Sequence, residues 1–168
     1  MIETIGAHEY GIRKYFLQKS IPVLFGMFFL IDSIYVFSTS FVVSIFDESL
    51  LETPFDKLPP FKVFVTTVIM APLLETLVFQ VLVIEVLRRF SVSMKYAIFI
   101  SGLVFGSVHQ YNVAYMIAIF FSGLLYAYAY VIVRYRLSIF RSALFLISLH
   151  ALGNLMTFFV NHLSKTLS

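Results

Sequence analysis

The chain has 168 residues, of which 60% are hydrophobic and only 12% are charged, about half the charged share of an ordinary soluble domain. This composition excludes a disordered chain and a nucleic-acid binder, and it leaves no room for a second, soluble domain. Cysteine is absent, which excludes disulfides, thiolate metal sites and a cysteine nucleophile. Because the chain is so apolar, its formal net charge of +3 is interpreted as orienting the chain in a membrane.

Residues 1–20 are predicted to form a cytoplasmic or interfacial N-terminal segment. Within it, residues 5–19 are a candidate interfacial helix, with an ordinary mobile tail as the alternative. The apolar run from Ile21 to Phe46 follows. It is much longer than the roughly 7–15-residue core of a signal peptide, so we expect a membrane helix that is retained.

Further apolar segments alternate with polar turns along the rest of the chain. Acidic residues and prolines predict an exposed loop over 47–60, and the apolar segment 61–87 predicts a second span. The apolar run 96–133 is just long enough for two crossings, so we expect a helical hairpin with a recessed polar turn at 109–112 that water reaches. Residues 139–160 form the last predicted span.

Together these segments predict an all-α integral membrane protein. It is a compact bundle of about five transmembrane helices over residues 21–160, followed by a short tail at 161–168. The N-terminal segment and the turns at 88–95 and 134–141 hold nine basic residues, against three in the opposite loops and tail. Because cytoplasmic loops carry the excess of Lys and Arg, the N-terminus is predicted to be cytoplasmic.

Four polar side chains fall at a similar depth in the predicted helices, where polar groups are costly and indicate function. Counted from the cytoplasmic helix ends, Glu75 lies at about 18 Å, His109 at about 20 Å and His150 at about 17 Å. Asn154 lies at about 22 Å, on the same helix face as His150. The alternative for each residue is a hydrogen bond that only cross-links helices.

Other residues inside the spans have simpler explanations. Asp32 falls at a depth of about 17 Å, and we expect it to bond a neighbouring helix, with membership of the same polar layer as the alternative. Glu85 precedes two arginines and predicts an ion pair at the helix end. Pro72 predicts a kink, and Gly102 and Gly106 predict close helix packing.

These residue types suit peptide hydrolysis without a covalent intermediate. A carboxylate in apolar surroundings can take a proton from water near neutral pH, and an imidazole can hold the water or carry the proton. A second imidazole and an amide can donate hydrogen bonds to an oxyanion. A divalent metal such as zinc on Glu75, His109 and His150 stays open, as does a proton or ion relay.

Three motifs in chain order resemble those of the CPBP family of intramembrane proteases. This family includes the type II CAAX prenyl endopeptidases and bacteriocin-processing or immunity proteins. Residues 71–80 (APLLETLVFQ) are similar to its first motif, 105–109 (FGSVH) to its FxxxH motif and 150–154 (HALGN) to its HxxxN motif. The likeness covers residues 61–160.

The resemblance implies a role for each matching residue. Glu75 would be the general base, aided by His109, and His150 and Asn154 would stabilise the oxyanion. Phe105, which opens the second motif, is a supporting residue.

The first motif departs from the family pattern at two positions. It usually reads EExxxR, whereas this chain has Thr76 and Gln80 at the second Glu and the Arg. Being four residues apart, the two neutral side chains can still hydrogen-bond, and they are predicted to support the site.

The resemblance implies an intramembrane endopeptidase of the bacterial inner membrane. It would be surrounded by membrane lipids and would cut a membrane-associated or lipidated peptide. The alternative is a non-catalytic membrane binding or bacteriocin-immunity protein on the same scaffold. Substitution of Glu75 discriminates the two.

Overall fold

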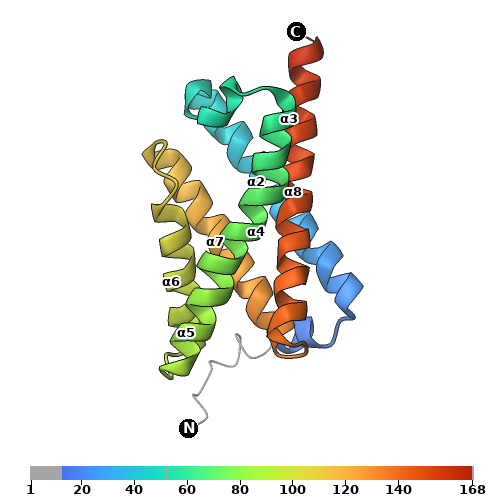
Figure 1. The fold of residues 1–168 in the computed structure, drawn as a ribbon, viewed down its shortest axis with the longest axis vertical. Coiled ribbons are helices and arrows are strands. Elements are labelled where there is room, and N and C mark those ends of the chain that lie inside the picture. Colours follow the sequence, from blue (N-terminus) through green and yellow to red (C-terminus); the bar gives the residue numbers. More distant parts are fainter. Residues whose placement is uncertain (1–12, 52, 168) are drawn as a thin grey trace.

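The computed structural model describes residues 13–51 and 53–167, which contain helices and no strand. The main helices are α2 (Ile21–Phe46), α6 (Met94–Ser107), α7 (Val113–Arg134) and α8 (Ile139–Leu167), together with a continuous helix from Pro60 to Arg89. In Figure 1 the Pro60–Arg89 helix lies between α6 and α8, with α2 and α7 behind it. The predicted all-α membrane bundle is confirmed.

Four of these helices are long and apolar enough to cross a membrane: Ile21–Phe46, Pro60–Arg89, Val113–Arg134 and Ile139–Asn161. The fifth, α6, has 14 residues and is about 21 Å long. A bilayer core is about 30 Å thick. Helix α6 by itself is therefore shorter than the core, and the recessed turn at 109–112 stays a prediction.

The second span changes helical type four times along its length, twice on each side of the α-helical turn that contains Pro72. It consists of α3 (Pro60–Val63), the π-helical segment η3 (Phe64–Met70), α4 (Ala71–Glu75), the π-helical segment η4 (Thr76–Leu82) and α5 (Val83–Arg89). Ala71 N–H donates to the Thr66 carbonyl, five residues back. The next bond in that register would join residue 72 to the Thr67 carbonyl, but proline has no N–H. The kink expected at Pro72 is thus a change of helical register that leaves the Thr67 carbonyl without a partner from its own helix.

Close packing of α6 against α7 depends on the predicted glycines. A Cβ added at Gly102 would lie 2.7 Å from Leu124 Cδ2, and one at Gly106 would lie 2.8 Å from Phe120 Cβ. This contact holds the end of α6, and with it His109, against the outer half of α7.

The bundle is filled at one end and hollow at the other. Buried apolar side chains of α2, α5, α7 and α8 form the core at the end with the basic turns, and they include Leu24, Phe28, Ile84, Tyr130 and Leu146. Farther along the same helices, the side chains surround a cavity of about 610 Å³.

The segment between α2 and α3 covers this cavity. It contains two short 3₁₀ helices, η1 (Glu48–Leu51) and η2 (Pro54–Lys57), and several of its apolar side chains line the cavity. The Asn112 amide donates to the Leu50 carbonyl at 2.9 Å, which fastens the segment to the α6–α7 turn. The loop predicted to be exposed therefore covers the cavity, because several of its apolar side chains line it.

The two ends of the chain differ from the sequence prediction. Residues 13–17 are helical, and the Phe16 ring stacks on Phe28 at 5.3 Å, so this part packs against the bundle. The rest of the candidate interfacial helix, residues 5–12, lies outside the described residues. Helix α8 continues to Leu167, beyond the predicted end of the last span.

Candidate active site

Glu75 lies between the two predicted histidines. Its Oε1 is 3.7 Å from His109 Nε2, and its Oε2 is 3.7 Å from His150 Nε2. The Glu75 side chain is 24% exposed, against 13% for His109 and 5% for His150, so the carboxylate is the most open of the three groups. Helix α4, helix α8 and the turn that follows α6 thus bring a carboxylate and two imidazoles together at the floor of the cavity.

The backbone of α6 orients His109. Its Nδ1 lies 2.7 Å from the Phe105 carbonyl oxygen, and because a carbonyl only accepts, this nitrogen carries the ring proton. His109 Nε2 then faces Glu75, and the two can share one further proton or a water molecule. The Phe105 ring also lies 4.8 Å from the His109 ring and 6.1 Å from the His150 ring, so Phe105 supports both imidazoles.

His150 is enclosed by side chains of two other helices. Thr76 Oγ1 lies 3.5 Å from its Nδ1, and the Tyr126 ring lies 4.7 Å from its ring. These contacts leave Nε2 as the ring nitrogen that faces Glu75.

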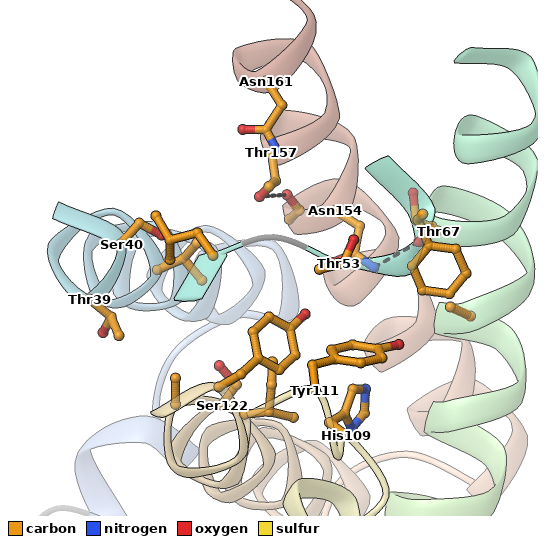
Figure 2. Close-up of a pocket in the computed structure, with 18 of the residues that line it drawn as sticks. Thr39, Ser40, Thr53, Thr67, His109, Tyr111, Ser122, Asn154, Thr157 and Asn161 are labelled. Carbon is orange, nitrogen blue, oxygen red and sulfur yellow. Dashed lines mark hydrogen bonds between the residues drawn. The ribbon is translucent and has the colours of Figure 1, made fainter. Parts of the chain in front are cut away.

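Asn154 satisfies the carbonyl that Pro72 leaves without a partner. Its Nδ2 donates to the Thr67 oxygen at 2.7 Å. An amide nitrogen carries two hydrogens, so this bond uses one donor and leaves the second for another acceptor. Figure 2 shows Asn154 and Thr67 on the cavity wall, with His109 and Tyr111 on the α6–α7 side.

The expected hydrogen bond between Thr76 and Gln80 is wrong. Thr76 instead contacts His150, and both amide atoms of the buried Gln80 lack a partner among the described residues. The Thr76 hydroxyl is turned toward His150 on α8, and not along its own helix toward Gln80.

Two further interpretations from the sequence hold. Asp32 bonds a neighbouring helix, since the Tyr126 hydroxyl donates to its Oδ2 at 3.2 Å. Glu85 pairs with Arg88 at 3.0 Å, and it also accepts from Arg134 at 2.9 Å.

Tyr126 is the site residue that sequence reasoning missed. It is buried, and it contacts both Asp32 and His150. The only signal in the sequence was a hydroxyl within an apolar helix, and the chain contains ten tyrosines.

The metal alternative would place an ion between Glu75, His109 and His150. Within the described residues, no group of three or more His, Asp or Glu side chains could hold a metal ion. Each imidazole instead faces a different oxygen of Glu75.

Fold and site together define a helical membrane protein with a carboxylate and two imidazoles at the floor of a cavity. A family model described as Rce1-like, type II CAAX prenyl endopeptidase matches residues 57–156, and the chain belongs to this family. That is a family of membrane peptidases, consistent with the CPBP resemblance of the motifs. Comparison with curated proteins and with solved structures gives no match.

Proposed function

We propose that the protein is an intramembrane endopeptidase in which Glu75 activates water for attack on a peptide bond. The observation that carries the proposal is the position of Glu75, within 3.7 Å of an imidazole on each side and open to a cavity of about 610 Å³. The family match supports the class of reaction.

In the proposed reaction each of the four polar site residues has one role. Glu75 takes a proton from a water molecule that His109 helps to hold, and the water oxygen attacks the peptide carbonyl. The oxyanion that forms accepts hydrogen bonds from His150 and from the second N–H of Asn154. The proton on Glu75 then passes to the leaving nitrogen as the C–N bond breaks.

The supporting residues hold this arrangement. Thr76 and Phe105 contact the imidazoles. Gln80 stands, uncharged and buried, where the family has arginine. We propose a membrane-associated or lipidated peptide as the substrate, and the bacterial inner membrane as the location.

The experiment compares Glu75→Gln with Glu85→Gln in detergent micelles, using an internally quenched peptide with a farnesylated cysteine. The wild-type protein cleaves the peptide, and Glu75→Gln lowers kcat by about 10²–10⁴-fold, the usual contribution of a general base. Glu85→Gln makes the same change on the same helix, outside the cavity lining, and keeps kcat within about threefold of wild type.

Cleavage by Glu75→Gln at the wild-type rate would contradict the proposal. Peptide binding without cleavage, unchanged by Glu75→Gln, would instead favour the non-catalytic binding or immunity protein.

A further inference from the structure

The two imidazoles beside Glu75 have different kinds of hydrogen-bond partner. His109 Nδ1 lies 2.7 Å from the Phe105 carbonyl oxygen, which can only accept. His150 Nδ1 lies 3.5 Å from the Thr76 hydroxyl, which can donate as well as accept. A neutral imidazole carries one ring proton, and the partner of one nitrogen decides which of the two nitrogens holds it. The two partners can therefore place this proton differently on the two rings.

The Thr76 hydroxyl needs an acceptor because it is buried. Thr76 is 0% exposed, and within the described part of the chain His150 Nδ1 is the hydrogen-bond partner of its side chain. A buried hydroxyl hydrogen without an acceptor costs free energy, so the hydroxyl donates and Nδ1 accepts. A ring nitrogen that accepts carries no proton, and the proton of His150 then lies on Nε2.

The surroundings of Nε2 agree with this assignment. His150 Nε2 lies 3.7 Å from Glu75 Oε2, and Glu75 is an acceptor when it acts as the proposed base. A proton on Nδ1 would turn the lone pair of Nε2 toward this oxygen. It would also leave the hydrogen of the Thr76 hydroxyl without an acceptor. Both contacts therefore favour the proton on Nε2.

His109 presents the opposite kind of nitrogen to Glu75. Its ring proton is on Nδ1, so Nε2 has a lone pair, and this nitrogen lies 3.7 Å from Glu75 Oε1. A water molecule can donate one hydrogen to each of these two acceptors. An accepting nitrogen thus faces the proposed water, whereas a donating nitrogen of His150 faces the proposed oxyanion.

We propose that the Thr76 hydroxyl holds His150 as the tautomer protonated on Nε2, so that the two imidazoles carry their protons on opposite nitrogens. This inference rests on the proposed function and makes Thr76 a positioning residue for the donor to the oxyanion. Thr76→Val keeps the shape of the side chain but removes the hydrogen that Nδ1 accepts. Thr76→Ser keeps that hydrogen.

The test observes the ring protons directly, so that it does not depend on turnover. The protein is labelled with histidine that carries a nitrogen isotope at δ1, and its nitrogen NMR spectrum is recorded in micelles at about pH 8, where an ordinary imidazole is neutral. Protonated and unprotonated ring nitrogens give well-separated signals. The chain has four histidines, and the variants His109→Gln and His150→Gln assign the two signals of the site.

In wild type we expect a protonated Nδ1 for His109 and an unprotonated Nδ1 for His150. Thr76→Ser keeps both signals. Thr76→Val moves the His150 signal, because Nδ1 loses its donor, and leaves the His109 signal in place as a check of the fold. The control Thr66→Val makes the same change earlier in the same span, outside the cavity lining, and moves neither signal.

Cleavage of the farnesylated peptide gives a second readout. Thr76→Val is expected to lower kcat by about threefold to tenfold, the value of one neutral hydrogen bond. KM stays nearly unchanged because Thr76 is outside the cavity lining, and Thr76→Ser restores kcat.

A protonated Nδ1 on His150 in wild type overturns the proposal, as does a His150 signal or a kcat that Thr76→Val leaves unchanged. The expected signals without any cleavage by wild type leave the tautomers standing and contradict only the peptidase.

Discussion

At the scale of single residues, Asn154 and Pro72 are linked through the Thr67 carbonyl. Proline cannot donate to this oxygen, and Asn154 donates to it from α8 at 2.7 Å. Asn154, which is expected to stabilise an oxyanion, therefore also supplies the hydrogen-bond donor that the Thr67 carbonyl lacks within its own helix. The depth of Asn154 was predictable from the sequence, but this partner was not, because hydropathy does not distinguish α from π register.

A mutant cycle tests this link. Asn154→Ala removes the donor and is expected to lower the free energy of unfolding by about 1–3 kcal/mol. In a Pro72→Ala background the new N–H can serve the Thr67 carbonyl, so the same substitution should cost about 1 kcal/mol less.

The matched control is Asn112→Ala, whose partner is the Leu50 carbonyl. Its effect on the free energy of unfolding should simply add to that of Pro72→Ala. Chemical unfolding in micelles measures each value, and an equal cost of Asn154→Ala in both backgrounds would refute the link.

At the scale of elements, the predicted spans agree closely with the helices. The first span has the predicted bounds, Ile21–Phe46, and the last begins at the predicted Ile139, because long apolar runs between charged turns are unambiguous. The π-helical segments and the cover over the cavity were not predictable, since they depend on Pro72 and on contacts between distant segments.

Close packing of α6 on α7 predicts contrasting effects of two glycine substitutions. Gly106→Ala places a Cβ 2.8 Å from Phe120 Cβ and 3.0 Å from the Met116 oxygen, and should destabilise the protein by about 1–3 kcal/mol.

Gly26→Ala meets no atom within 4 Å in α2 and should stabilise by up to about 1 kcal/mol, because alanine favours a helix. Thermal unfolding of both variants measures the contrast. Equal melting temperatures would be inconsistent with this packing.

At the scale of the whole molecule, the bundle is packed at the basic end and hollow at the other. The four polar residues predicted from depth lie near the boundary between these halves, where Glu75 is partly exposed to the cavity. Which faces of the helices meet there could not be predicted from depth alone, and for this reason Tyr126 was missed.

The natural absence of cysteine allows the orientation to be measured by single-cysteine labelling. With the basic turns in the cytoplasm, Ser49→Cys should react with a membrane-impermeant maleimide in intact cells. Ser138→Cys should react only after the cells are permeabilised. The reverse pattern would contradict the predicted orientation.

In the proposed reaction Glu75 and the two imidazoles act as one catalytic unit. The most direct measurement is kcat/KM for Glu75→Gln, His150→Gln and the double variant on the same cleaved peptide. Rate losses from substituting members of one catalytic unit are non-additive, so we expect the double variant to be no slower than the slower single variant, within about threefold. Losses that multiply in the double variant, or a wild-type rate in either single variant, would contradict it.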